Sequence, residues 1–326
     1  MSAFRFEREK VFMAGFFYLF SIIYAKTNFN LSKRAAAFCF VLCAIFLSAS
    51  CRSEKPLVQT DAPTREVTDD LGRTIKIPQN IERAVSLAPN LTENIFAVSA
   101  GSKLVGVTSF CDYPLEAQNI AKIGDTINPN METIIALKPQ IVFVSTASQI
   151  ETFTRTLEQQ NINVFVTNPN DFEGVLRNLK QLGDVLGTTA NAEKLIADLR
   201  NRVKAVAEKV KDKPKTKVFV QISKEPLFTI GKDSFITEII ERAGGESVTK
   251  NVATAYPKLS KETALALNPG AIILSESPDN LEPNDVFVNS GAVKNNRVYR
   301  VNAAWLARPG PRIVDALELL AKDLHD

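Results

Sequence analysis

Short apolar runs alternate with helical patterns along most of the chain, which is typical of an α/β fold. The runs are rich in valine and isoleucine, and the segments between them space their apolar positions three or four residues apart. Such short runs are typical of buried strands in a parallel sheet whose two faces are covered by helices. In the first half, the expected strands are residues 84–88, 104–107, 141–144 and 164–166, and the expected helices include residues 131–137 and 151–160.

Two local patterns precede this alternation or fall within it. Residues 67–78 alternate in polarity around Gly72, which predicts a β-hairpin. Residues 90–93 read Asn-Leu-Thr-Glu, the spacing of a capping box, so we expect a helix with Asn90 as its N-cap and Glu93 reaching back to the backbone.

A long helical pattern occupies residues 171–213, and Gly183 and Gly187 predict a break within it. Beyond the break the apolar residues recur at spacings of three and four, which predicts an amphipathic helix of about 22 residues and about 33 Å. A second α/β pattern begins after Pro214 with the apolar run 218–222. The apolar stripe of the helix consists of Leu195, Leu199, Val203, Val206 and Val210.

An internal repeat supports two related halves. Residues 131–139 (METIIALKP) parallel residues 261–269 (KETALALNP), and each runs into an apolar strand. A weaker match relates Thr92-Glu93 to Thr237-Glu238. Repetition of this kind indicates a duplicated structural unit. We therefore expect two α/β lobes, each with a largely parallel central sheet, joined by one long interlobe helix. The expected divisions are a leader at 1–50, a tether at 51–66, an N-terminal lobe at 67–187, the interlobe helix at 188–213 and a C-terminal lobe at 214–326.

The leader has the pattern of an export signal. Lys33 and Arg34 precede an apolar run at 35–47, which is followed by the small residues 48–50 and Cys51. A cysteine at this place resembles the lipobox of bacterial lipoproteins, which implies a lipid anchor on Cys51. A plain signal peptide and an uncleaved anchor are the alternatives. A second apolar run at 11–25 fits either a true start near Leu31 or an additional membrane segment.

Charge and cysteine content limit the functional classes to which the protein could belong. The 326 residues suit two domains, and the net charge of +3 comes from the leader, because the chain from Cys51 onward has 33 basic and 34 acidic residues. Nucleic-acid binding needs clustered basic surface, so that class is excluded. Only Cys111 remains free in the body, so no internal disulfide is expected.

Five stretches carry a resemblance to a known family. The residues from about 66 to 324 resemble the helical-backbone class of binding proteins of ABC importers, which includes receptors for cobalamin, haem and ferric siderophores. This resemblance implies a monomeric periplasmic protein that captures a cobalt or iron chelate between its lobes and delivers it to a permease dimer. Cobalamin or a related corrinoid is the first expectation, and a ferric siderophore or haem is the alternative. The stretches are residues 85–93, 112–114, 137–139, 244–246 and 311–312.

The resemblance also implies site residues. Aromatic faces and a few polar groups are typical of sites for flat ligands. Some of these residues also have a structural alternative to ligand binding. Trp305 and Phe228 could be core residues, Arg308 a solvated loop residue, and the neighbouring Arg312 part of a first helical turn. The sequence departs from the corrinoid receptors at Thr126, Ser145 and Ala304. The expected ligand contacts are Phe110, Asp112, Tyr113, Phe228, Tyr256, Trp305 and Arg308.

Glu132 and Glu262 occupy equivalent first-turn positions in the repeat. A first-turn glutamate by itself only complements the helix dipole. The resemblance places one such carboxylate on each lobe, where it pairs with arginines of the permease, and charge pairs of this kind favour encounter and register.

An enzyme is not expected. The single histidine is His325, and the sequence has neither a dinucleotide-binding glycine motif nor a P-loop. We therefore expect no catalytic residues, no protein-held metal or cofactor and no histidine-rich zinc or manganese site. A scaffold or adhesion lipoprotein remains a third class, but it would not need a duplicated docking carboxylate.

Overall fold

The computed structural model describes residues 63–145 and 150–326. The leader, Cys51 and nearly all of the tether lie outside these residues. Among the described residues, none of the helices combines the length and apolar character that a membrane span requires.

The folded body begins with the predicted hairpin. Strands β1 (Thr64–Thr68) and β2 (Thr74–Pro78) pair antiparallel, so residues 64–66 belong to a strand and not to the tether. The buried carboxylate of Asp69 accepts hydrogen bonds from the backbone N–H groups of Leu71 and Arg73, both at 3.0 Å, and from the Arg73 guanidinium at 2.7 Å. Gly72 takes a positive φ of 75° in the turn, a conformation that glycine adopts without strain.

The first sheet has four parallel strands in the order β4-β3-β5-β6. All four were predicted, although β3 ends at Ser86 because helix α3 begins at Pro89. The strands are β3 (Ala84–Ser86), β4 (Leu104–Val107), β5 (Ile141–Ser145) and β6 (Asn163–Thr167), with helices α3 (Pro89–Ala97), α4 (Met131–Ala136), α5 (Ile150–Glu158) and α6 (Phe172–Leu186) and short 3₁₀ turns at Gly101–Lys103 and Leu115–Asn119.

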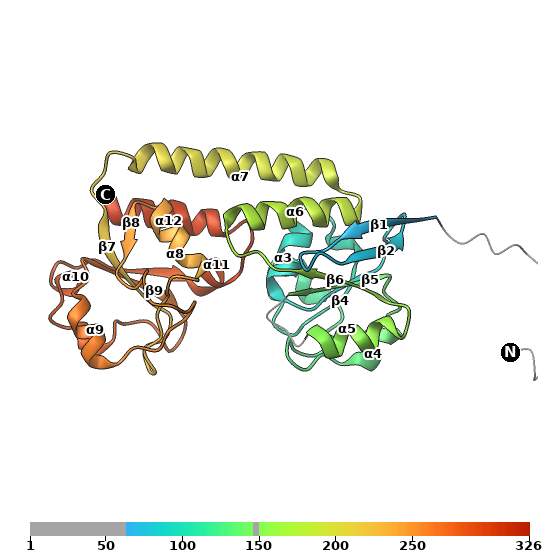
Figure 1. Cartoon of the computed structure of the whole chain (residues 1–326), viewed down its shortest axis with the longest axis horizontal. Coiled ribbons are helices and arrows are strands. Elements are labelled where there is room, and N and C mark those ends of the chain that lie inside the picture. The colour runs from blue at the N-terminus through green and yellow to red at the C-terminus, as the bar shows by residue number, and fades with distance from the viewer. Residues whose placement is uncertain (1–62, 146–149) are drawn as a thin grey trace, which may run out of the picture. The chain divides into compact units, whose positions relative to one another are not determined.

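The second sheet repeats this topology. Its order is β10-β9-β7-β8, again all parallel, so in both sheets the first strand in the chain lies between the second and the third. The α/β fold with two parallel sheets is thereby confirmed (Figure 1). The strands are β7 (Thr216–Gln221), β8 (Gly245–Ser247), β9 (Ala271–Glu276) and β10 (Val298–Asn302), with helices α8 (Phe235–Arg242), α9 (Lys261–Leu267), α10 (Gly291–Lys294), α11 (Ala303–Ala307) and α12 (Ile313–His325) and a 3₁₀ turn at Asp285–Phe287.

Helix α7 (Thr189–Val210) is the long amphipathic helix, and it packs on α6 and α12. Its role as the one connection between lobes stays a prediction. The predicted break lies at Gly187 alone, which ends α6 in the left-handed conformation with φ 73°. The prediction for Gly183 was wrong: it lies inside α6, where a Cβ atom would come within 2.5 Å of the Ala192 Cβ of α7. Glycine is required there by close helix packing, not by a turn.

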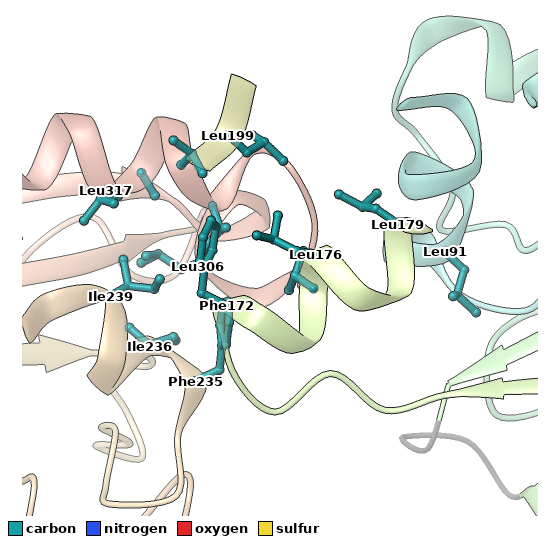
Figure 2. Close-up of a cluster of buried hydrophobic side chains, with 14 of the residues drawn as sticks. Leu91, Phe172, Leu176, Leu179, Leu199, Phe235, Ile236, Ile239, Leu306 and Leu317 are labelled. Carbon is teal, nitrogen blue, oxygen red and sulfur yellow. The ribbon is translucent and has the colours of Figure 1, made fainter. Parts of the chain in front are cut away.

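One hydrophobic cluster has members from Ile77 to Leu324 and joins the described residues of both sheets. It includes Phe143 of the first sheet and Ile273 of the second. Helix α6 contributes Phe172 and Leu176, which lie beside residues of α8 and the segment around Leu306 (Figure 2). The opposite face of each sheet has its own smaller cluster, to which Val142 and Phe219 belong. Both faces of each sheet are thus covered, as parallel sheets require.

Candidate functional site

Segments that follow β3, β4 and β10 meet at the carboxyl ends of these strands. Ligands of parallel α/β proteins bind outside the carboxyl ends of the strands. The contacts of the segment after β10 with the other two include ion pairs and hydrogen bonds between residues about 200 positions apart in the chain. Asn94 Nδ2, for example, donates to the Pro309 carbonyl at 3.1 Å. The candidate site is built around this junction.

Arg308 is the centre of the junction. Its Nη1 donates to Glu93 Oε1 at 2.7 Å and to Asp112 Oδ1 at 2.6 Å, and its side chain is only 19% exposed. Its side chain makes no other hydrogen bond to the part of the chain that the structure describes, so the guanidinium edge formed by Nε and Nη2 has no partner there. That edge is the one with which a guanidinium binds carboxylate, phosphate or amide oxygens. The alternative of a solvated loop residue therefore does not hold for Arg308, and its contact with a ligand stays a prediction.

Glu93 holds a second guanidinium. Arg312 donates from Nε to Glu93 Oε2 at 2.9 Å and from Nη2 to Oε1 at 2.6 Å. Glu93 is 4% exposed, and burial of a carboxylate is tolerated when it is paired and hydrogen-bonded in this way. Arg312 is the N-cap residue of α12 and lies just before its first turn.

The predicted capping box is wrong. Pro89 begins α3 with Ala88 as N-cap, and no side chain caps the helix. Proline suits the first helical turn because it lacks the N–H that would be unpaired there. Glu93 therefore lies beyond the position from which it could reach back, and its carboxylate binds the two arginines instead.

Two aromatic residues flank Asp112 in the loop after β4. Phe110 is 59% exposed and Tyr113 is 46% exposed. The Arg312 guanidinium carbon lies 4.0 Å from the centre of the Tyr113 ring, a cation–π contact that fixes the ring. The hydrogen bond from Arg308 holds the pKa of Asp112 below its ordinary value. A cavity of about 340 Å³ adjoins this group, and its lining includes Phe96, Glu116 and Pro311.

Phe228 and Tyr256 lie on neighbouring segments of the second half. Phe228 exchanges backbone hydrogen bonds with Ile222 and Ser223 in a tight turn and is half-buried. The backbone of the loop that carries Tyr256 bonds to that of Thr229, and Tyr256 is half exposed. The contact of either side chain with a ligand stays a prediction.

A buried amide cluster supports the turn that carries Phe228. Gln221 Nε2 donates to Asn280 Oδ1 at 2.6 Å, and Asn280 Nδ2 donates to the Ile222 carbonyl at 3.3 Å. Asn284 Nδ2 donates to the Lys224 carbonyl at 2.8 Å. Sequence reasoning did not identify these residues, since isolated Asn and Gln residues in a sequence carry no signal of their own.

Trp305 lies on α11, three residues before Arg308, and is partly buried against the main hydrophobic cluster. The structure thus supports its role as a core contact, and a role in ligand binding stays a prediction.

The Cys111 thiol is buried between Thr92 and Thr108, 3.1 and 3.2 Å from their hydroxyls. Among the described residues no cluster of histidine, cysteine and carboxylate side chains could hold a metal ion.

Glu132 and Glu262 are exposed and equivalently placed. Asn130 caps α4 by accepting from the Thr133 N–H at 2.9 Å, and Ser260 caps α9 by accepting from the Thr263 N–H at 3.1 Å. The pKa of Glu262 is lowered by its own backbone N–H and by Ser260. The predicted equivalence of the two helices is confirmed, whereas the docking role stays a prediction.

Residues 85–304 match the family described as periplasmic binding proteins. The chain belongs to this family. Its members are non-enzymatic transport components, so the protein is not an enzyme. The matched residues include Glu93, Asp112 and the whole of both sheets except the first residue of β3.

Relatives support the same assignment. The chain is 28% identical over 313 residues to the uncharacterized ABC transporter substrate-binding lipoprotein YvrC of Bacillus subtilis strain 168, covering 90% of this chain and 98% of YvrC. It is 30% identical to a vitamin B12-binding protein of Vibrio parahaemolyticus, covering 73% and 87%. The crystal structure of a periplasmic heme-binding protein of Pseudomonas aeruginosa superposes with a TM-score of 0.68 at 26% identity, covering 75% and 93%.

Proposed function

We propose that this extracytoplasmic substrate-binding protein of an ABC transporter captures cobalamin or a related corrinoid at the Arg308 junction. The observation that carries the proposal is the free Nε–Nη2 edge of Arg308, a partly buried arginine that bonds to Asp112 in the loop with the exposed rings of Phe110 and Tyr113. A corrinoid offers a broad, flat face to aromatic side chains and amide oxygens at its rim to an arginine fork. The 30% identical relative named as a vitamin B12-binding protein supports the same ligand.

Haem or a ferric siderophore is the second candidate. The Arg308 edge suits the propionates of haem as well as it suits amides, because both offer oxygen acceptors. The 26% identical heme-binding structure favours this ligand. A protein of this class would bind one of these chelates in preference to the others.

The proposal predicts that loss of one exposed ring weakens ligand binding. Phe110→Ala should lower the affinity for cyanocobalamin about tenfold in a calorimetric titration, since an aromatic contact contributes about 0.5–1.5 kcal/mol beyond its burial. Leu115→Ala is the matched control, because Leu115 is exposed in the same loop region but is not an expected ligand contact. Equal affinities of wild type and Phe110→Ala would contradict this site.

The permease is the protein partner of such a receptor, and we propose that Glu132 and Glu262 are its contacts. Each is an exposed first-turn carboxylate two residues after a side-chain N-cap, on the helix before the third strand of its sheet. The double variant Glu132→Ala/Glu262→Ala should lose ligand uptake by cells while it keeps the wild-type ligand affinity. Glu208→Ala on α7 is the control; unimpaired uptake by the double variant would refute the docking role.

Anchoring through a lipid on Cys51 is likewise our proposal. Cys51 lies outside the described residues, and the lipoprotein name of YvrC supports the anchor. Cys51→Ser should abolish incorporation of labelled fatty acid and release the protein from the membrane fraction. Labelling of the Cys51→Ser protein would refute the anchor.

A further inference from the structure

Glu93 and Glu238 are related by the internal repeat. Helices α3 and α8 each follow the first strand of one sheet. Glu93 lies in the second turn of α3, and Glu238 lies in the first turn of α8. Both carboxylates contact a segment that follows the fourth strand of the other sheet: residues 308–312, between α11 and α12, for Glu93, and the start of α6 for Glu238. Glu93 binds the arginines before α12, whereas Glu238 Oε2 accepts from the backbone N–H of Phe172, the first residue of α6, at 2.9 Å.

The two contacts differ in what they hold. Glu238 is 28% exposed and pairs with Arg242 of its own helix at 2.7 Å, so it fixes only the backbone at the start of α6. Glu93 is almost fully buried and takes both of its partners from the segment 308–312. One of these partners is Arg308, the residue whose Nε–Nη2 edge we expect to contact the ligand.

We propose that Glu93 is the positioning residue of the ligand site, and that it acts through Arg308. Its carboxylate fixes Nη1 of Arg308 and leaves Nε and Nη2 for the ligand, while Arg312 occupies the remaining positions of the same carboxylate. An arginine that is already ordered loses less side-chain entropy on binding than a free one. The inference deepens the proposed function, because it assumes that Arg308 contacts the ligand.

Arg312 is the second arginine that the Glu93 carboxylate holds. It binds Glu93 with two N–H groups and covers the Tyr113 ring. Glu93 thereby connects the arginine fork and one of the exposed aromatic rings, so one buried carboxylate sets the positions of two expected ligand contacts. Asp112, which is 63% exposed, adds a second acceptor for Arg308 but no support from within the core.

A double-mutant cycle on the full chain in detergent tests the inference. Trp305 is the single tryptophan of the chain and lies three residues from Arg308, so quenching of its fluorescence reports binding of cyanocobalamin or haemin. Glu93→Gln removes the charge and keeps the shape, and Glu238→Gln is the matched control. We expect Glu93→Gln to weaken binding of the preferred ligand at least tenfold and Glu238→Gln to change it less than threefold.

The cycle separates positioning from a general structural role. If Glu93 acts through Arg308, then Arg308→Met lowers affinity strongly in the wild-type and Glu238→Gln backgrounds but less than threefold in the Glu93→Gln background. If the fold-losses in affinity of Glu93→Gln and Arg308→Met multiply in the double variant, the two residues act independently and the inference is overturned. Equal losses of affinity in Glu93→Gln and Glu238→Gln would also overturn it. Should Glu93→Gln not fold, Arg312→Lys takes its place, since it keeps the charge but loses the two-pronged contact with Glu93.

Hydrogen exchange gives a readout that needs no ligand. In Glu93→Gln the amides of Arg308 and Ile313, which donate to the Ala304 and Gly310 carbonyls, should exchange at least tenfold faster than in wild type, whereas in Glu238→Gln the faster exchange should be confined to the start of α6. Unchanged exchange of the Arg308 and Ile313 amides in Glu93→Gln overturns the inference even if neither cyanocobalamin nor haemin binds. Failure of both ligands to bind wild type, with the exchange result as expected, removes the proposed ligands and leaves the positioning of Arg308 intact.

Discussion

Replacing Gly183 by alanine should destabilise the protein, although alanine is the better helix former. A Cβ atom at Gly183 of α6 would lie 2.5 Å from the Cβ of Ala192 on α7. Carbon atoms in contact are normally about 3.5–4.0 Å apart, so the two helices would have to separate by about 1 Å or more at this point.

The magnitude follows from two opposing effects. Overpacking of this kind costs about 1–3 kcal/mol, and the higher helix propensity of alanine returns about 0.5–1 kcal/mol. The expected net loss is about 1–2 kcal/mol, or about 2–8 °C in Tm for a folded unit of this size. Thermal unfolding followed by circular dichroism measures it.

Two further variants separate packing from propensity. In Gly183→Ala/Ala192→Gly the methyl group moves from one helix to the other, so the double variant should be more stable than the two single losses together predict. Gly291→Ala is the control, because the nearest atom to a Cβ there is the Pro269 carbonyl oxygen at 3.8 Å, and its effect should stay within about 0.5 kcal/mol. A higher Tm for Gly183→Ala would refute the close contact of α6 with α7.

Three other predictions concern single side chains. Asn130→Ala and Ser260→Ala should each lower the free energy of unfolding in urea by about 1 kcal/mol, the usual effect of losing a helix N-cap; no loss would contradict the capping geometry. Asp69→Asn should cost about 2–3 kcal/mol in the same assay, since it weakens the charge-assisted hydrogen bonds of a buried carboxylate, and wild-type stability would contradict its role in the hairpin. The pKa of Asp112 is lower in the folded protein because of Arg308, so its contribution to stability is present above the ordinary aspartate pKa of about 3.9 and is lost as the pH falls through the folded pKa. Asp112→Asn should therefore be less stable than wild type at pH 7 and equally stable in strong acid, and a difference that grows on acidification would refute this sign.

The fold could be predicted from the sequence because its signals are local. Strand runs, the hairpin around Gly72 and the two capped helices of the repeat depend on residues close together in the chain. The duplicated topology followed from a repeat that spans only nine residues. Gly183 was misjudged because a glycine required for close packing of helices has the same appearance in a sequence as a glycine that ends one.

The candidate site was harder to predict, since it depends on distant partners. Glu93 and Arg308 are 215 positions apart, and within its own segment Glu93 has the spacing of a capping box. Its match with Glu238 in the repeat and its place in the stretch 85–93 singled it out, but neither reveals the partner. Exposed residues such as Phe110 and Tyr113 could be selected through family resemblance, whereas the buried cluster of Gln221, Asn280 and Asn284 could not.

The central claim is capture of a chelate ligand at the Arg308 junction. Isothermal titration of the protein with cyanocobalamin, and in parallel with haemin and a ferric siderophore, tests it most directly. The account predicts sub-micromolar binding of one ligand at one site per chain, strongest for cyanocobalamin and weakened by Arg308→Met. Tight binding of haemin or the siderophore instead would change the assigned ligand and keep the assigned site. Binding that Arg308→Met leaves unchanged, or no binding of any of the three ligands, would contradict the account.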